Sequence, residues 1–337
     1  MSSSAIADTI FNASKIYTLA VYFVVLFGGL IGNICNIIVF NCLKVFRRNQ
    51  CVFYLMVTSI VDFVLLLLVI PFRVTDYVFD YDPARLSIVW CKIRNALVAT
   101  FSLMSFSSTC FAAIDQYLST HYYPQLRQLS TLKLAHRLVA IAIVILSLHS
   151  IPFLIFFEIH PTLGCGVYNV GFSRYYSFVH FCVLSGVLPI TLSGLCAALA
   201  YVNVRRIVRR QTTIVRRRLD RQLTAMILIR VAFLVATTSP FVLIRIYQLN
   251  RPTIDPNDYV RKAVEQLIST IASSLFYINS AGTFYVFLLV SKRFRQQTKR
   301  VLVKNIWKQL FGFLRISSPA QNQVAPTSDG ATDPDFD

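Results

Sequence analysis

The sequence contains little charge. Of its 337 residues only 14% are charged and 55% are hydrophobic, whereas a soluble protein usually has about 25% charged residues. Charged residues are almost absent from several apolar stretches of roughly 18 residues or more, each long enough to cross the hydrocarbon core of a bilayer as a helix. Because backbone amides find no water in lipid, such stretches adopt helices. The composition therefore excludes an ordinary soluble fold and predicts an all-α membrane protein.

Seven apolar stretches follow one another, with no Gly/Ser-rich linker or internal repeat between them. They cover residues 16–43, 53–74, 88–120, 134–157, 175–204, 223–248 and 260–290. We therefore predict one seven-transmembrane helix bundle over residues 16–290. Residues 1–15 form a short polar N-terminus that lacks the basic start and the cleavage site of a removable signal peptide.

Two further segments follow the last span. Residues 291–303 combine apolar side chains such as Phe294 and Val301 with several basic ones, which predicts a short amphipathic eighth helix on the inner membrane surface. The alternative is a basic juxtamembrane stretch held by anionic lipid. Residues 317–337 are polar, acidic and contain proline, which predicts a disordered cytoplasmic tail.

The net charge of +18 lies mainly in the loops. The loop after the fifth span is the most basic, with Arg205, Arg206, Arg209, Arg210, Arg216, Arg217, Arg218 and Arg221. Basic residues favour the cytoplasmic side, so we expect a multi-pass plasma-membrane protein with an extracellular N-terminus and a cytoplasmic C-terminus. The lipid contacts of such a protein account for the charge, and no module typical of nucleic-acid binding is present. The Asn12-Ala13-Ser14 sequon then lies outside, so Asn12 is a predicted glycosylation site.

Signatures of catalysis and transport are missing. The sequence has no His-Glu-x-x-His or Gly-x-Ser-x-Gly motif, and its histidines are scattered, so we expect neither an enzyme nor a resident cofactor. Transporters usually show repeated halves, broken helices and paired midplane charges. This chain has an odd number of spans and one main midplane charge, Asp62, so a small-solute transporter is the less favoured alternative from another class.

The eight cysteines allow one extracellular disulfide. Most of them lie inside apolar spans and are interpreted as small packing residues. Cys51 lies at the edge of a cytoplasmic loop. Cys91 and Cys165 are the pair that can meet on the outer side, so we predict a disulfide between them.

A series of marker residues occurs in a fixed order along the spans. The markers are Gly32-Asn33, Asp62, Pro71-Phe72, Cys91, Asp115-Gln116-Tyr117, Cys165, Pro189, Pro240 and Asn279-Ser280. In this order the chain resembles the rhodopsin-like G-protein-coupled receptors, and in particular a diverged invertebrate branch similar to peptide receptors. The resemblance implies a receptor that transduces an extracellular ligand, expected to be a peptide, to heterotrimeric G proteins, with arrestin as a further partner.

Asp62 is an ionisable group inside a span, where charge is expensive and usually marks function or a buried partner. The resemblance implies that Asp62 binds an allosteric sodium ion together with Ser105, Asn279 and Ser280. The alternative is a protonated Asp62 that is simply hydrogen-bonded.

Several switch positions depart from the family pattern. Gln116 replaces the usual arginine, Thr238 stands where a tryptophan is usual, and Phe284 and Phe287 occupy the Asn-Pro-x-x-Tyr region. The predicted G-protein-facing switch comprises Asp115, Gln116, Tyr117, Arg230, Pro240 and Phe287. These departures leave open a decoy or arrestin-biased receptor of the same fold.

Arg230 lies in the cytoplasmic half of the sixth span. One hypothesis is that it supplies the guanidinium missing at Gln116 and pairs with Asp115 or Asp62. The alternative is that it extends to the inner headgroups.

The outer ends of the spans carry the candidate ligand-binding residues Arg73, Tyr77, Arg94, Asn95, Arg245, Gln248 and Glu265. With so short an N-terminus, we expect the ligand to bind in the mouth of the bundle. Several arginines there suit a carboxylate or an acidic peptide, although they could instead pair with Asp76, Asp255 and Asp258. Val98 replaces the aspartate of amine receptors, and the seventh span lacks the retinal lysine of opsins, so neither function is expected.

Overall fold

The structure is a computed structural model that describes residues 3–47, 49–79, 83–161, 164–207, 214–250 and 258–303. Within these ranges, seven helical segments are long and apolar enough to cross a membrane, which confirms the predicted seven-helix bundle. They are α1 (Ser3–Cys42), α3 (Gln50–Phe79), α5 (Ile88–Ser119), α7 (Leu132–His149) with α8 (Ile151–Phe156), α9 (Val170–Tyr175) with the π-helix η1 (Tyr176–Val187) and α10 (Leu188–Ile207), α11 (Ile214–Asn250) and α12 (Tyr259–Val290).

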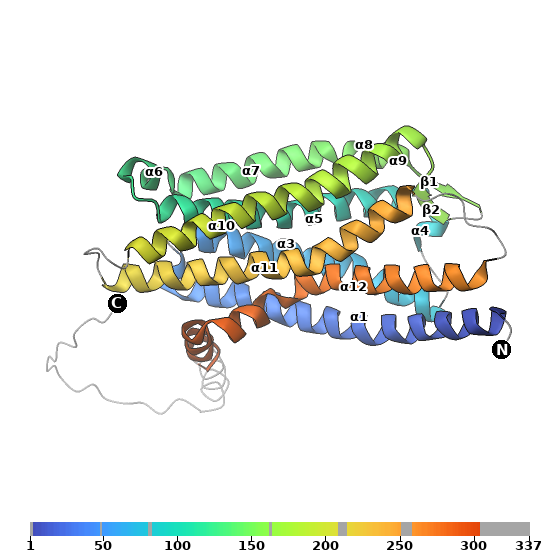
Figure 1. Cartoon of the computed structure of the whole chain (residues 1–337), viewed down its shortest axis with the longest axis horizontal. Coiled ribbons are helices and arrows are strands. Elements are labelled where there is room, and N and C mark those ends of the chain that lie inside the picture. Colours follow the sequence, from blue (N-terminus) through green and yellow to red (C-terminus); the bar gives the residue numbers. More distant parts are fainter. Residues whose placement is uncertain are drawn as a thin grey trace, which may run out of the picture.

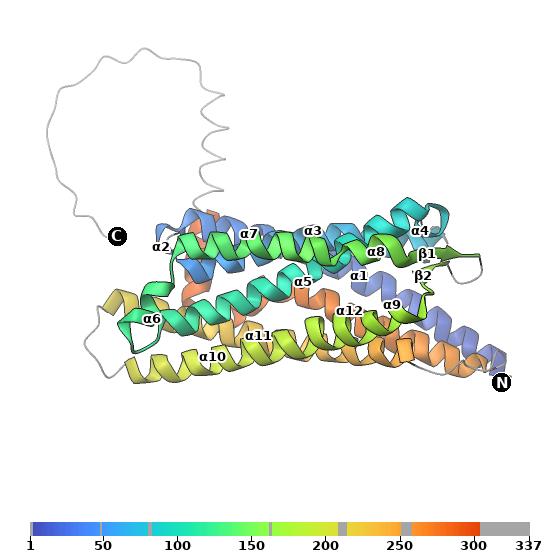
Figure 2. The same cartoon turned by 90° about the horizontal axis from the view of Figure 1, so that it is seen from above.

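The long helices run side by side along one axis (Figure 1). Helix α5 crosses the bundle diagonally (Figure 2) and packs against α3, α7, α10 and α11, while α1 packs against α3 and α12. The start of α1 lies at the same end as a hairpin of β1 (Phe157–His160) and β2 (Gly164–Val167) and the short helix α4 (Pro83–Leu86). We call this the disulfide end. The opposite end contains α2 (Lys44–Arg47) and α6 (Pro124–Leu129) (Figure 2), and we call it the Gln116 end.

Side-chain caps set several helix starts. The Ser87 hydroxyl accepts from the Trp90 N–H at 3.3 Å, and the Thr131 hydroxyl accepts from the Leu134 N–H at 3.2 Å. Each cap satisfies an amide that has no partner within its helix.

The outward faces of the helices are apolar. On α7, for example, the side chains of Ile141, Val144 and Leu148 are each more than half exposed. So large an apolar face suits contact with lipid, not water.

Helix α1 begins earlier than the predicted span, because residues 3–15 continue the helix toward the disulfide end. These residues pack on α12: the Ser14 hydroxyl donates to Thr270 at 3.3 Å, and the Tyr17 hydroxyl lies 2.8 Å from that of Ser274. Hydropathy did not predict this part of α1, because the segment contains many polar side chains. Asn12 is exposed on the same segment.

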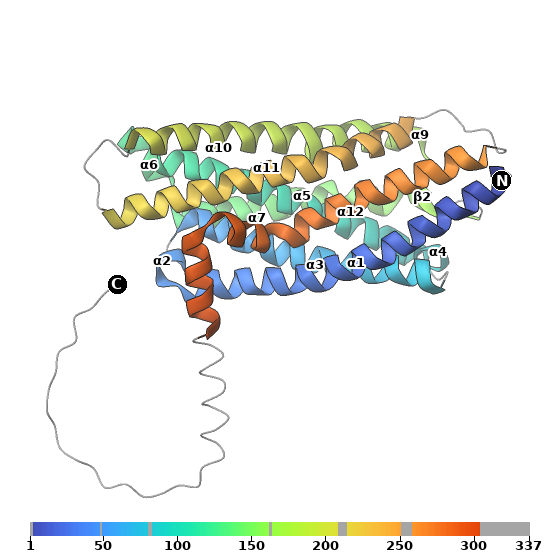
Figure 3. The same cartoon turned by 60° about the horizontal axis from the view of Figure 1, so that its bottom comes forward.

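The chain after α12 forms a further helix over residues 292–303, which turns across the bundle axis (Figure 3). The Ser291 hydroxyl caps it by accepting from the Phe294 N–H at 3.1 Å. Phe294, Thr298 and Val301 are buried, at the spacing of one helical face, and Lys299 is exposed. Residues 292–303 are therefore helical with one buried face, whereas the predicted disordered tail, 317–337, lies outside the described residues.

Candidate functional site

A covalently tethered hairpin covers the disulfide end. Cys91, at the start of α5, is bonded to Cys165 on β2 with their Cα atoms 5.9 Å apart, so the predicted disulfide is formed. Strands β1 and β2 pair antiparallel, with Ile159 opposite Cys165. Gly164 has φ +77°, which favours glycine, and the Tyr168 hydroxyl donates to its carbonyl oxygen at 2.6 Å. Burial raises the pKa of the Tyr168 phenol.

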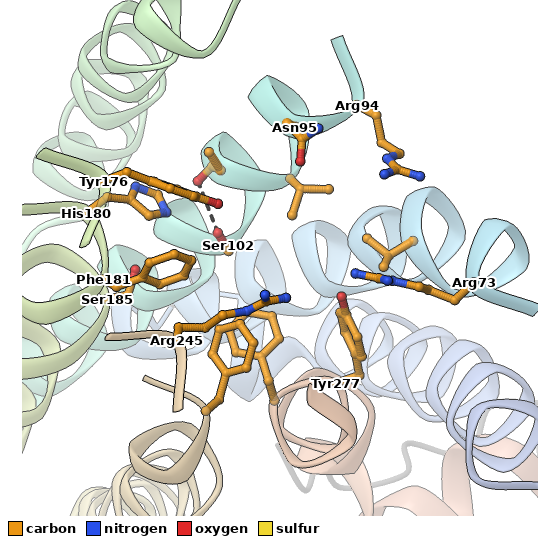
Figure 4. A pocket seen from close by; sticks show the side chains of 15 residues that line it. Arg73, Arg94, Asn95, Ser102, Tyr176, His180, Phe181, Ser185, Arg245 and Tyr277 are labelled. Atoms are coloured by element: carbon orange, nitrogen blue, oxygen red, sulfur yellow. Dashed lines mark hydrogen bonds between the residues drawn. The ribbon is translucent and has the colours of Figure 1, made fainter. Parts of the chain in front are cut away.

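Two adjoining cavities lie beneath this hairpin. The upper has a volume of about 360 Å³ and the lower a volume of about 100 Å³. Side chains common to both are Arg73, Arg94, Asn95, Tyr176, Phe181 and Arg245. The lower cavity has an aromatic floor: the rings of Phe241 and Phe276 pack at a tilt of 35° with their centroids 4.5 Å apart, and Tyr277 also lines the cavity. Together they form one recess, in which the arginines line both cavities and the aromatic rings line the lower one. Figure 4 shows the side chains that line the lower cavity.

Four of the predicted ligand-binding residues line both cavities, namely Arg73, Arg94, Asn95 and Arg245. Gln248 lines the upper cavity. Glu265 is the exception. It accepts from the Tyr247 hydroxyl at 3.1 Å and pairs with Arg261 at 3.3 Å, and it lines neither cavity. The backbone of Tyr77 belongs to α3, but its side chain lies outside the described residues.

Sequence reasoning missed the contribution of η1 to the cavity wall. Tyr176, His180, Phe181 and Ser185 all project into the lower cavity (Figure 4). A wider helical turn changes which side chains share a face, so a standard helical period does not find them. The Leu188 N–H bonds to the Val183 carbonyl, five residues back, immediately before a proline. Pro189 lacks an N–H and therefore leaves one helical hydrogen bond unmade. This proline was the feature of the sequence from which an irregular helical turn could have been predicted.

A charged cluster occupies the interior of the bundle. The Ser105 hydroxyl donates to Asp62 at 2.8 Å, and the Ser280 side chain lies near the same carboxylate. Arg230 donates to Asn279, and its second terminal nitrogen lies 3.8 Å from the other Asp62 oxygen. The side chains of Asp62 and Arg230 are both 0% exposed. The alternative in which Arg230 extends to the headgroups is therefore wrong, and its partner is Asp62, not Asp115.

A neutral hydrogen bond connects α5 to α11 at the Gln116 end. The Gln116 amide donates to the Thr224 hydroxyl at 2.8 Å, while Asp115 accepts from Ser130 at 2.6 Å. Tyr117 is half-buried and its ring lies edge-on to that of His121 at 5.3 Å.

Two other predicted switch positions lie on α11 and α12. Pro240 lies inside α11. Phe287 is fully buried against Phe294, with ring centroids 5.8 Å apart. Thr238, near Pro240, is buried, and its hydroxyl has no hydrogen-bond partner among the described residues. The switch positions are thus distributed over several packed helices.

These features define a seven-transmembrane receptor, with a recess at one end, a buried charged centre and helix-to-helix contacts at the other end. The chain belongs to the rhodopsin family: the model of the 7 transmembrane receptor (rhodopsin family) matches residues 32–282. Comparison with curated proteins gives no match. The protein is therefore a multi-pass receptor of the plasma membrane.

Proposed function

We propose that this receptor binds an extracellular peptide at the disulfide end and activates heterotrimeric G proteins at the Gln116 end. The observation that carries the proposal is the recess beneath the Cys91–Cys165 hairpin, to which α3, α5, η1, α11 and α12 all contribute side chains. A ligand that contacts these helices together can change how they pack, and differential contacts of this kind are what shift a conformational equilibrium.

The chemistry of the recess supports a peptide. The upper cavity adjoins the hairpin backbone at Gly164 and Gly166, which offers main-chain groups to an extended chain. Val98, in the lower cavity, leaves that position without the carboxylate that a biogenic amine needs. These features favour the peptide-receptor-like branch that the sequence resembles.

We further propose that Arg230 takes the place of the sodium ion predicted at Asp62. A guanidinium beside Asp62, bonded to Asn279, supplies a positive charge that belongs to α11. Movement of the inner half of α11 would then separate a buried ion pair, and the energy of that pair would favour the resting arrangement. The Gln116–Thr224 bond joins the same two helices, α5 and α11, as a second and weaker restraint.

Guanine-nucleotide exchange tests the proposal directly. The purified full-length receptor, in lipid nanodiscs with purified G proteins, should accelerate exchange when a member of a neuropeptide library is added. A Cys91→Ser variant should lose the response, whereas Cys182→Ser, a matched change within η1, should retain it. No acceleration by any G-protein class would contradict G-protein coupling.

A non-signalling or arrestin-biased receptor is the second candidate, because Gln116 replaces the arginine expected for G-protein contact. Arrestin recruitment without nucleotide exchange would support it. Solute flux into receptor-containing vesicles in the absence of ligand would instead indicate the transporter alternative.

A further inference from the structure

Three arginines from separate helices enter one recess. Arg73 comes from α3, Arg94 from α5 and Arg245 from α11, and all three line both cavities. We call them the arginine cluster. Figure 4 shows Arg73 and Arg245 extended toward one another, with the Tyr277 side chain rising from α12 beside them. Like charges that face a shared cavity repel each other, and an anion placed between them would relieve that repulsion.

Three of the acids described near this end of the bundle each have a partner outside the arginine cluster. Among the described residues that line the two cavities, the only carboxylate is Asp76, which pairs with Arg85 at 3.5 Å. Asp258 accepts from the Arg261 N–H at 3.1 Å and caps α12. Glu265 pairs with Arg261 outside the recess. The described lining of the recess thus carries an excess of positive charge.

The hydrogen-bonding capacity of Arg245 is only partly used within the described residues. Its guanidinium donates to Gln248 through one long bond of 3.4 Å and lies 5.3 Å from the centroid of the Phe241 ring. Its Nε is buried and has no hydrogen-bond partner among the described residues. A buried donor without a partner costs free energy, so this side chain is suited to an acceptor supplied from outside the protein.

We propose that the arginine cluster binds a carboxylate of the ligand, attached to an aromatic or branched apolar group that enters the lower cavity. This inference rests on the proposed ligand-binding function of the recess. A planar guanidinium matches a carboxylate through two parallel hydrogen bonds. Phe241, Phe276 and Tyr277 line the lower cavity together with the arginines, and their rings suit an apolar group attached to that carboxylate.

Two kinds of molecule carry this chemistry: a peptide whose C-terminal residue is apolar and not amidated, and a small aromatic acid. The volume of about 100 Å³ in the lower cavity accommodates one such group in either case. The upper cavity, of about 360 Å³, would hold the preceding residues of a peptide and would stay largely filled with water around a small acid.

Direct binding tests the proposal without any signalling readout. The full-length receptor in nanodiscs is titrated with N-acetyl tetrapeptides ending in Phe, Tyr or Leu, as acids and as C-terminal amides, and with 3-phenylpropionate and its amide. Ligand-induced thermal stabilisation reports affinity. We expect an acid to bind at least about tenfold more tightly than its amide, since one charge-assisted bidentate contact is lost. Binding of a peptide acid or of 3-phenylpropionate then shows which kind of molecule supplies the carboxylate.

Three variants assign the contact. Arg245→Gln should weaken binding of the acid about tenfold or more and leave the amide unchanged. Arg245→Lys should recover only part of it, because an ammonium lacks the planar fork. Arg261→Gln removes the same charge from an exposed site outside the recess and should bind like the wild type.

Equal binding of acid and amide, unchanged binding in Arg245→Gln, or no stabilisation by any carboxylate would each overturn the proposal. The proposed signalling function fails differently. If the receptor binds the acid but never accelerates nucleotide exchange, the carboxylate site is supported and only the proposed G-protein coupling is refuted.

Discussion

Removal of the Arg230 charge is the most informative perturbation of this receptor. Arg230 and Asp62 are both 0% exposed, with nitrogen and oxygen 3.8 Å apart. At an effective dielectric constant of about 20, their attraction is about 4 kcal/mol. Removal of one partner of a buried pair usually costs about 3–5 kcal/mol, because it leaves an uncompensated charge. We therefore expect Arg230→Met to lower the unfolding temperature of the purified receptor by about 10 °C.

A double-mutant cycle separates the ion pair from simple packing. The double variant Arg230→Met with Asp62→Asn should recover most of the lost stability, since no charge is then left buried without a partner. Thermal unfolding can be followed with a thiol-reactive dye, because Cys51 and Cys110 are buried in the folded bundle. Arg261→Gln, at an exposed ion pair, is the matched control and should unfold close to the wild type. Additive losses in the double variant would refute the proposed coupling.

The same variants test the replacement of sodium. If Arg230 supplies the cation, exchange of potassium for sodium should leave the wild-type unfolding temperature unchanged. In Arg230→Met the Asp62 carboxylate keeps Ser105 and Ser280 as neighbours and becomes available to an ion. Sodium at ten times its Kd would then stabilise the variant by about 1.4 kcal/mol. Sodium dependence in the wild type would show that Arg230 does not exclude the ion.

Three further predictions concern other parts of the molecule. Thr224→Val removes the Gln116 bond, worth about 1 kcal/mol, so basal nucleotide exchange should rise up to about fivefold. Thr237→Val is its control, because that hydroxyl bonds within α11, and an equal rise there would contradict the restraint. Cys91→Ser should cost about 2–5 kcal/mol and reduce surface expression measured by flow cytometry, and normal surface expression would count against the stabilising role of the disulfide. Asn12→Gln should abolish the gel shift produced by N-glycosidase on wild-type receptor, and a wild-type receptor without any shift would argue against glycosylation there.

The candidate site was partly predictable. Asp62 is conspicuous as a carboxylate in an apolar span, and the cavity arginines Arg73, Arg94 and Arg245 stand at the ends of such spans. Glu265 carries the same sequence signal, yet its side chain pairs with Arg261 outside the recess. Position along a span therefore indicates depth in the membrane, but it does not indicate which neighbour a side chain meets.

The sequence by itself determined the seven spans and the cysteine pair, because transfer of apolar groups into lipid and the chemistry of thiols depend on residue type and order. Only the tertiary structure decided between Asp62 and Asp115 as the partner of Arg230, showed that η1 directs His180 and Phe181 into the recess, and placed three arginines around one cavity. These outcomes depend on helix rotation and packing, which bring together residues far apart in the chain. Periodicity along one helix carries no information about the face that its neighbour presents.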